Sequence, residues 1–191
     1  MKRSIREIQF AGFGGQGIVL SGYILGQGIT IFEGRNSSMT QSYGPEARGG
    51  ACSSGVVIAD NPDEMVPYPK VTEPDVLVCM SQEAYTTYLH KIKSGGILIY
   101  DSDLVTIDNK RYDIEYIPIP ATKRAEELGN KLVANSIMLG VLQRITGVCS
   151  AEALKKSIEI SVRRDYVDIN IKAFEEGIKL AEEFLKEEVK R

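Results

Sequence analysis

The sequence predicts an α/β fold of the Rossmann-like type, in which helices flank a mainly parallel sheet. Strand-like and helix-like segments alternate along the first two thirds of the 191 residues, an order typical of parallel sheets. Residues 75–80 (DVLVCM) form a nearly continuous apolar run, as expected of a strand that is buried on both faces. The final third lacks strand-like segments and is predicted to be helical.

The predicted elements follow from these patterns in order. Strands are expected at residues 5–11, 36–40, 52–59, 75–80, 97–100 and 114–118. Helices are expected at residues 18–32, 82–93, 121–128, 132–146, 151–161 and 167–190. Ser81 can cap the second helix, because its hydroxyl can accept a hydrogen bond from an unpaired backbone N–H. The last helix carries an apolar stripe that is expected to face the core, consisting of Ile171, Phe174, Ile178, Ala181 and Leu185.

Length and composition indicate a single domain over residues 1–191. The formal net charge of −3 provides no general attraction to nucleic acid. No segment approaches the ~18 uncharged apolar residues of a membrane span, and the start lacks the apolar run of a signal peptide. Cys52, Cys79 and Cys149 are widely spaced and are expected to be small buried residues rather than disulfide or metal ligands. We therefore expect a protein of the reducing cytoplasm.

A glycine-rich segment, GFGGQG at residues 12–17, matches the pattern G-x-G-x-x-G. It follows a predicted strand and opens a predicted helix, which is the context in which this pattern marks a phosphate site. Glycines allow a tight turn and a close approach of a ligand to the backbone, and the helix start offers unpaired N–H groups to an anion. The candidate ligand contacts in this segment are Gly12, Gly14, Gly15, Gln16 and Gly17.

The carboxylate that a dinucleotide site needs ~20 residues further on is missing from this sequence. The only nearby acid is Glu33, which precedes the second predicted strand instead of ending it. NAD is therefore a poor candidate. Three interpretations remain: another phosphate-bearing group, close docking of a partner's backbone, or glycines that only allow the helix to pack closely on the strand.

A second glycine-rich segment, SYGPEARGG at residues 42–50, follows the second predicted strand. Ligands of open α/β sheets bind along the carboxyl edge of the strands, so we expect both glycine-rich segments to share that edge. The guanidinium of Arg48 offers forked donors for a carboxylate or phosphate. The alternative is a surface turn with a solvated Arg–Glu pair. The candidate contacts here are Gly44, Glu46, Arg48, Gly49 and Gly50.

No catalytic group and no metal-binding set stands out in the sequence. His90 is the only histidine and is expected to be a solvated residue of a helix. Asp101 and Asp103 follow a strand at the predicted binding edge; they are candidates for hydrogen bonds to a ligand, although a polar turn explains them better. A stand-alone enzyme would normally show a nucleophile, a base or a metal site, so an incomplete site is expected.

Several segments together resemble the gamma subunit, or gamma domain, of the 2-oxoacid:ferredoxin oxidoreductases. They are AGFGGQGIVLSGYILG, TQSYGPEARGGACSSGVVIAD, DVLVCMSQEAYTTYL and GGILIYDSDLV. Asn135, Leu139-Gly140 and NIKAFEEG at residues 170–177 also fit the family's pattern. The uninterrupted SYGPEARGG is most similar to the 2-oxoglutarate branch. The resemblance covers nearly the entire chain.

The resemblance implies one subunit of an enzyme that oxidatively decarboxylates a 2-oxoacid with coenzyme A. The products would be an acyl-CoA (succinyl-CoA from 2-oxoglutarate), CO2 and two electrons for ferredoxin or flavodoxin. Alpha, beta and delta subunits would hold the thiamine diphosphate and the iron–sulfur clusters, while the gamma part would help to close the site over CoA. The ten candidate residues of the two glycine-rich segments are therefore assigned to CoA.

Other interpretations stay open. The chain could belong to the pyruvate, ketoisovalerate or indolepyruvate branch of the family, or it could be a non-catalytic nucleotide-binding or docking module. A subunit of a complex is expected to expose an apolar docking face, which would favour a homodimer when the chain is isolated.

Overall fold

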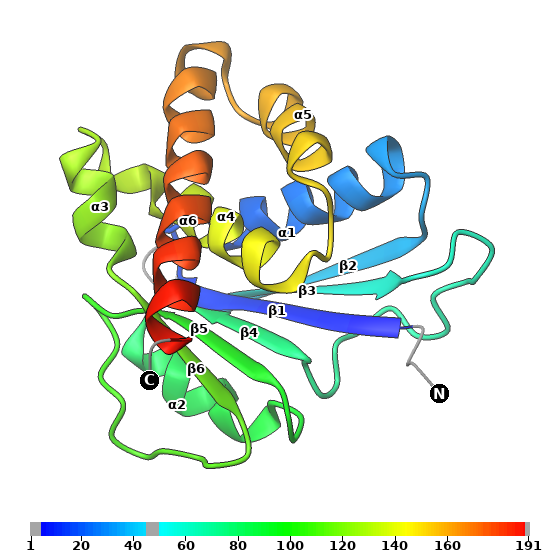
Figure 1. Ribbon diagram of the computed structural model, residues 1–191. Helices are drawn as coiled ribbons and strands as arrows, with labels where there is room; N and C mark the ends of the chain where they lie inside the picture. Colours follow the sequence, from blue (N-terminus) through cyan, green and yellow to red (C-terminus); the bar gives the residue numbers. More distant parts are fainter. Residues whose placement is uncertain (1–4, 45–49, 190–191) are drawn as a thin grey trace.

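The computed structural model describes residues 5–44 and 50–189 and contains a six-stranded mixed sheet with helices on both faces (Figure 1). The strands are β1 (Ile5–Phe13), β2 (Ser37–Tyr43), β3 (Ala51–Ala59), β4 (Val76–Cys79), β5 (Ile97–Asp101) and β6 (Glu115–Ile119). Their order in the sheet is β2-β3-β1-β4-β5-β6. The predicted fold class, a mainly parallel sheet with flanking helices, is confirmed.

One strand runs against the others. β1, β4, β5 and β6 pair in parallel, whereas β3 is antiparallel to both β1 and β2. Only residues 44–50 join β2 to β3, and a parallel connection needs a crossover of about a dozen residues or more. The chain therefore turns back directly after β2, and β3 pairs antiparallel to it. Because β3 lies between them, β1 and β2 point the same way and end at the same edge.

The helices form two unequal layers. Helices α1, α3, α4, α5 and α6 lie on one side of the sheet, and α2 lies on the other (Figure 1). Their bounds are α1 (Ile18–Gln27), α2 (Gln82–Tyr88), α3 (Ala121–Glu127), α4 (Ala134–Thr146), α5 (Ala151–Ser161) and α6 (Val167–Glu188). A π-helical turn η1 (Gly28–Phe32) extends α1, and short 3-10 turns are η2 (Leu89–Lys91), η3 (Lys131–Val133) and η4 (Arg164–Tyr166). The helical final third is thus as predicted.

Hydrophobic side chains fill both sides of the sheet. The larger core, under α1, α4, α5 and α6, includes Ile8, Phe10, Leu25, Leu139 and Phe174. The smaller core, under α2, includes Leu77, Tyr85 and Leu98. Ser81 caps α2 as predicted, since its Oγ accepts a hydrogen bond of 3.1 Å from the N–H of Ala84.

Helices α4 and α6 pack backbone against backbone. A methyl group on Gly140 would overlap the carbonyl oxygen of Phe174, and one on Gly177 would overlap that of Ile137. The predicted stripe of α6 faces the core, where Phe174 and Ala181 are buried and Ile171 and Ile178 pack against it. Of the predicted stripe, Phe174 and Ala181 are buried, whereas three members are only half-buried: Ile171, Ile178 and Leu185. The buried face of α6 also contains Asn170, Ala173, Gly177 and Leu180.

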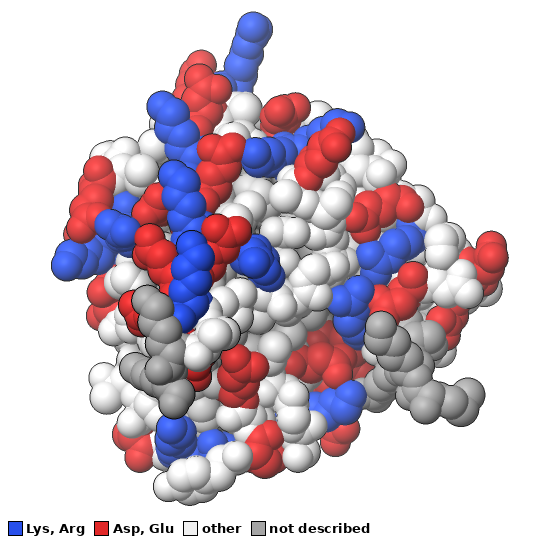
Figure 2. Space-filling model, viewed as in Figure 1, with Lys and Arg blue, Asp and Glu red and all other residues white. Residues whose placement is uncertain are grey.

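Charged side chains of both signs are interspersed over α6 and the neighbouring surface in Figure 2. No helix in the described part of the chain is long and apolar enough to cross a membrane. Among residues 5–44 and 50–189, no three or more histidine, cysteine or acidic side chains are grouped so that they could hold a metal ion.

The three cysteines are free thiols and all are buried, as the sequence predicts. Burial raises the pKa of Cys79 and of Cys149 to about 12. At pH 8 only about one such thiol in 10⁴ would be ionised, compared with roughly a quarter of unperturbed thiols. The thiolate is the species that reacts with alkylating reagents.

Iodoacetamide at pH 8 is therefore expected to label Cys79 and Cys149 of the folded chain about 10³-fold more slowly than the same residues in urea. Peptide mass spectrometry over time gives the two rates. Rapid labelling of Cys79 without denaturant would contradict the burial described here.

Candidate functional site

The first glycine-rich segment forms a tight turn between β1 and α1. Gly15 and Gly17 have φ angles of 97° and 75°, in the left-handed region that favours glycine. Gly12 is buried within β1, where it pairs with Cys52, whereas Gly14 and Gly15 are exposed. A Cβ on Gly15 would meet no atom within 4 Å. The turn therefore presents open backbone at its tip while both of its ends are held in place.

The side chain of Gln16 fixes this turn from the inside. Its Oε1 accepts a 2.6 Å hydrogen bond from the N–H of Phe13, and its Nε2 donates a 2.8 Å hydrogen bond to the carbonyl of Met80. The N–H of Met80 in turn donates to the carbonyl of Ala11. Both polar atoms of the Gln16 amide are thus engaged within the chain. Gln16 thus positions the turn at the end of β4, and its contact with a ligand stays a prediction, since it also lines the pocket beside the turn.

The two glycine-rich segments lie at the same edge of the sheet, as predicted. The N–H of Gly14 donates a 2.9 Å hydrogen bond to the carbonyl of Gly50, and the N–H of Gly44 donates one of 2.7 Å to the carbonyl of Ala51. The remaining predicted contacts of the second segment lie outside the described residues; these are Glu46, Arg48 and Gly49.

Asn135, at the start of α4, packs against the turn from the helical side. Its Nδ2 lies 3.4 Å from the carbonyl oxygen of Gly17 and 3.5 Å from Oγ of Ser21. A methyl group on Gly17 would overlap the Asn135 amide. Gly17 is therefore needed both for its backbone angle and for the space that Asn135 occupies.

Two pockets open beside the exposed tip of the turn, with Gly15 and Leu132 lining both. The first, of about 370 Å³, is also lined by Met80, Leu104 and Lys131. Leu104 and Leu132 are 41% and 63% exposed and add apolar surface to this pocket. The pocket thus combines apolar walls with a cation and with free backbone.

The second pocket, of about 340 Å³, is lined by Arg163, Tyr166 and Asn170 among others. The Arg163 guanidinium lies 5.7 Å from the centre of the Tyr166 ring, within the range of a cation–π contact. Pockets that bind small molecules are mostly apolar with a few polar groups. The two pockets together suit an elongated ligand that carries both apolar and anionic parts.

Sequence patterns did not identify the residues of these walls, among them Leu104, Lys131, Leu132 and Arg163. They come from three separate places in the chain: Leu104 follows β5, Lys131 and Leu132 lie in η3, and Arg163 precedes η4. The exposed leucine beside a lysine at residues 131–132 was the only local signal, and such pairs are common on surfaces.

Asp101 and Asp103 hold α3 in place rather than facing a ligand. Oδ2 of Asp101 accepts hydrogen bonds from the N–H and the hydroxyl of Thr122, at 3.1 and 2.6 Å, and its Oδ1 accepts one of 3.1 Å from the N–H of Asp103. Asp103 accepts a 2.8 Å hydrogen bond from the N–H of Lys123. Burial raises the pKa of Asp101, although the hydrogen bonds from Thr122 oppose the rise. Of the two interpretations, the polar turn is correct.

Glu33 and His90 take the places that their sequence context suggests. The carboxylate of Glu33 accepts a 2.6 Å hydrogen bond from the N–H of Ser150 and forms an ion pair of 2.8 Å with Arg35. It is therefore engaged away from the glycine turn and is no ribose ligand. His90 is exposed in η2, as predicted.

Residues 7–180 match the family described as pyruvate ferredoxin/flavodoxin oxidoreductase. The chain belongs to this family. Subunit KorC of 2-oxoglutarate synthase from Methanocaldococcus jannaschii is 46% identical over 180 residues, which cover 93% of this chain and 95% of the relative.

Solved structures show the same relationship. The gamma subunit of keto/oxoacid ferredoxin oxidoreductase from Geobacter sulfurreducens superposes with a TM-score of 0.80 at 37% identity, covering 92% of this chain and 98% of that one. The 2-oxoglutarate:ferredoxin oxidoreductase of Magnetococcus marinus, solved with 2-oxoglutarate, CoA and succinyl-CoA bound, has a TM-score of 0.84 at 24% identity. It covers 95% of this chain but only 32% of that chain, and this likeness shows a shared fold. The resemblance to the gamma subunit that the glycine-rich segments indicate is confirmed.

Proposed function

We propose that this chain is the gamma subunit of a multi-subunit 2-oxoglutarate:ferredoxin oxidoreductase. The complex would convert 2-oxoglutarate and CoA into succinyl-CoA and CO2 and pass two electrons to ferredoxin or flavodoxin. The observation that carries the proposal is the contact between the two glycine-rich segments, Gly14 to Gly50, in a chain 46% identical to a 2-oxoglutarate synthase subunit. In such a complex the chain would be one domain, residues 1–191, and would work in the cytoplasm.

The chain would supply a wall of a shared active site rather than a complete one. The carboxylates nearest the edge, Asp101 and Asp103, are committed to α3, and His90 lies in η2. Thiamine diphosphate and the iron–sulfur clusters would belong to alpha, beta and delta partner subunits. When bound there, thiamine diphosphate would supply the decarboxylation chemistry, and the part of this chain would be to hold and orient CoA.

The crevice around Gly15 fits CoA in its chemistry. The exposed backbone of Gly15 leaves room for a phosphate to approach, and the start of α1 favours negative charge. Lys131 and Arg163 add cations on either side, and Leu132 offers apolar surface between them. The phosphates of CoA would lie at the glycine turn, with Arg48 as a further cation from the second segment.

Substituting Arg48 by alanine in the assembled enzyme tests this assignment. A lost charge-assisted hydrogen bond costs about 1.5–3 kcal/mol, so the Michaelis constant for CoA is expected to rise about 10- to 100-fold, while that for 2-oxoglutarate stays the same. Steady-state ferredoxin reduction at varied CoA measures both constants.

A matched control is Arg144→Ala, which removes an exposed arginine that pairs with Glu182 at 3.2 Å between α4 and α6. It should leave the Michaelis constant for CoA unchanged. If Arg48→Ala also leaves the affinity and Michaelis constant for CoA unchanged, Arg48 is not part of the site.

Turnover of the assembled enzyme with different 2-oxoacids tests the substrate branch. Succinyl-CoA formation from 2-oxoglutarate should exceed turnover of pyruvate, ketoisovalerate and indolepyruvate. A preference for one of these acids would move the chain to that branch of the family without affecting the role of the glycine turn. If the assembled chain affects no turnover, it is a docking module.

A further inference from the structure

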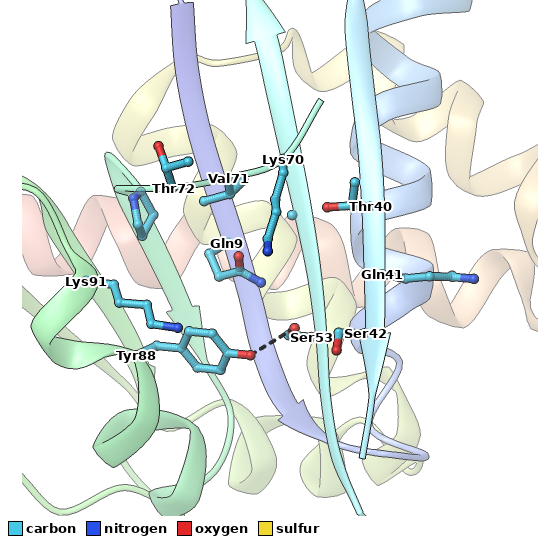
Figure 3. Close-up of a pocket in the computed structure, with 12 residues that line it drawn as sticks. Gln9, Thr40, Gln41, Ser42, Ser53, Lys70, Val71, Thr72, Tyr88 and Lys91 are labelled. Carbon is cyan, nitrogen blue, oxygen red and sulfur yellow. Dashed lines mark hydrogen bonds between the residues drawn. The ribbon is translucent and has the colours of Figure 1, made fainter. Parts of the chain in front are cut away.

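A polar pocket lies on the opposite side of the sheet from α1, over β1, β2 and β3 (Figure 3). Its volume is about 450 Å³. Gln9 of β1, Thr40 and Ser42 of β2 and Ser53 of β3 contribute its floor. In contrast, the next residue of β3, Ser54, lies beside Gly22 of α1 on the other side of the sheet. Alternation along three strands thus places small polar side chains on the face that α1 does not cover.

One wall of the pocket is the segment 70–74, which Glu7 and Gly55 hold against the sheet. The carboxylate of Glu7 accepts hydrogen bonds from the N–H groups of Thr72, at 2.6 Å, and Glu73, at 3.1 Å. A Cβ on Gly55 would lie 2.8 Å from Cγ2 of Val71, so the missing side chain lets the segment approach. This wall is therefore held in place on the strands by hydrogen bonds and by close packing.

The facing wall comes from the end of α2 and from η2. The hydroxyl of Tyr88 donates a 3.0 Å hydrogen bond to Oγ of Ser53, which ties α2 to β3 across β1. The ammonium group of Lys91 lies 4.9 Å from the centre of the Tyr88 ring. Figure 3 shows Lys91 extending along the ring toward the floor of the pocket and Lys70 reaching toward Gln9 from the other wall.

The pocket is positively charged in a chain whose formal net charge is −3. Lys70 and Lys91 line it, and among residues 5–44 and 50–189 no aspartate or glutamate does so. Neither lysine forms an ion pair with any residue in the described part of the chain. The carboxylate of Glu7, which holds one wall, is engaged by Thr72 and Glu73. Among the described residues, two cations thus line a polar floor and no acidic side chain lines the pocket with them.

We propose that this pocket binds a small phosphate-bearing ligand, with Lys70 and Lys91 contacting the phosphate. Lysine ammonium groups act as point charges and are common phosphate binders. The hydroxyls of Ser42 and Ser53 add hydrogen-bonding groups on the floor. The volume lies within the range of small-molecule sites. This site is separate from the crevice at Gly15 and does not depend on the CoA assignment.

Titration of the full chain with inorganic pyrophosphate tests the proposal. Calorimetry gives the affinity, and amide chemical shifts locate the site, which should affect Ser53 and Gly55. Replacing Lys70 and Lys91 together by glutamine is expected to weaken binding by about tenfold or more, because two charge contacts of this kind are lost. Binding should also weaken as salt is added.

Two further double variants distinguish binding at a specific site from non-specific attraction of pyrophosphate to positive charge. Lys70→Arg with Lys91→Arg keeps both charges and should retain binding. Lys172→Gln with Lys179→Gln removes the same charge from α6, on the other side of the sheet, and should not affect binding. Circular dichroism checks that each variant is folded. The Arg48→Ala variant should bind pyrophosphate at this pocket with the same affinity as the wild type. The test of this pocket is therefore independent of the test of CoA binding.

Three results would overturn the proposal. The first is a Lys70→Gln/Lys91→Gln variant that binds as tightly as the wild type. The second is no detectable binding of millimolar pyrophosphate to the wild-type pocket. The third is tighter binding of succinate than of pyrophosphate at the same amides, which would make the pocket a carboxylate site.

Discussion

The Gly177→Ala variant is expected to be less stable than the wild type by about 1–3 kcal/mol. Alanine normally stabilises a helix by about 1 kcal/mol relative to glycine. Here the sign reverses, because the added methyl group would overlap the carbonyl oxygen of Ile137 on α4. The two helices would have to separate along their whole contact, which would loosen the packing of Phe174. Urea unfolding followed by circular dichroism measures the change.

Gly140→Ala should have a similar effect, because its methyl group would overlap the carbonyl oxygen of Phe174 on α6. The double variant should lose less than the sum of the two single losses, since one separation of α4 from α6 relieves both overlaps. Gly26→Ala is the matched control. Its Cβ would lie 3.6 Å from Oγ of Ser37, an ordinary contact, so stability should rise by up to about 1 kcal/mol. Equal stability of Gly177→Ala and wild type would disprove the close packing.

Gln16→Ala should damage both the folded state and the use of CoA. The variant removes the partners of the Phe13 N–H and of the Met80 carbonyl. Leaving buried backbone groups unpaired costs about 1–3 kcal/mol each. The turn would lose its attachment to β4, and with it the fixed position of the Gly14 and Gly15 backbone. We expect the Michaelis constant for CoA to rise about tenfold or more in the assembled enzyme, because a phosphate site depends on fixed donors.

Asn36 provides a control for Gln16→Ala. It precedes β2, at the end of that strand that lies away from the glycine-rich segments. Its Nδ2 donates hydrogen bonds of 3.0 and 2.8 Å to the carbonyls of Pro62 and Glu64. Asn36→Ala thus also removes two hydrogen bonds to backbone, yet far from the glycine turn. It should leave the Michaelis constant for CoA unchanged. If both variants change that constant equally, Gln16 acts through stability alone.

Much of the fold follows from local patterns. The apolar run at residues 75–80 became β4, and the serine before the next helix caps it as its chemistry suggests. The strand direction of β3 was not evident, because β-strand patterns carry no direction and only the short connection from β2 determines it. The apolar stripe of α6 faces the core as predicted, although the buried face is wider than the stripe and includes Gly177. Glycine carries no hydrophobic signal, yet Gly177 lies at the centre of that face.

The backbone conformation of the glycine turn could be predicted from the sequence, whereas the side chains that line the two pockets could not. Glycines with positive φ and an exposed tip follow from the pattern G-x-G-x-x-G. The inward-facing role of Gln16 could not be inferred, because it depends on Met80, which is distant in sequence. The same holds for Leu104 and Leu132, which converge only through tertiary structure. For Asp101 the local pattern was misleading. Its position at a strand end made it a candidate for a ligand contact, but its carboxylate accepts a hydrogen bond from Thr122.

The most direct test is reconstitution of the complex with and without this chain. The partner subunits that co-purify with it from the native cell would be assembled alone and together with it, and reduction of ferredoxin by 2-oxoglutarate and CoA would be measured. We expect CoA-dependent reduction to require this chain and to fall when the Gln16→Ala variant replaces it at limiting CoA. Partner subunits that reach the full rate without the chain, or a native chain that purifies alone, would contradict its assignment as the gamma subunit.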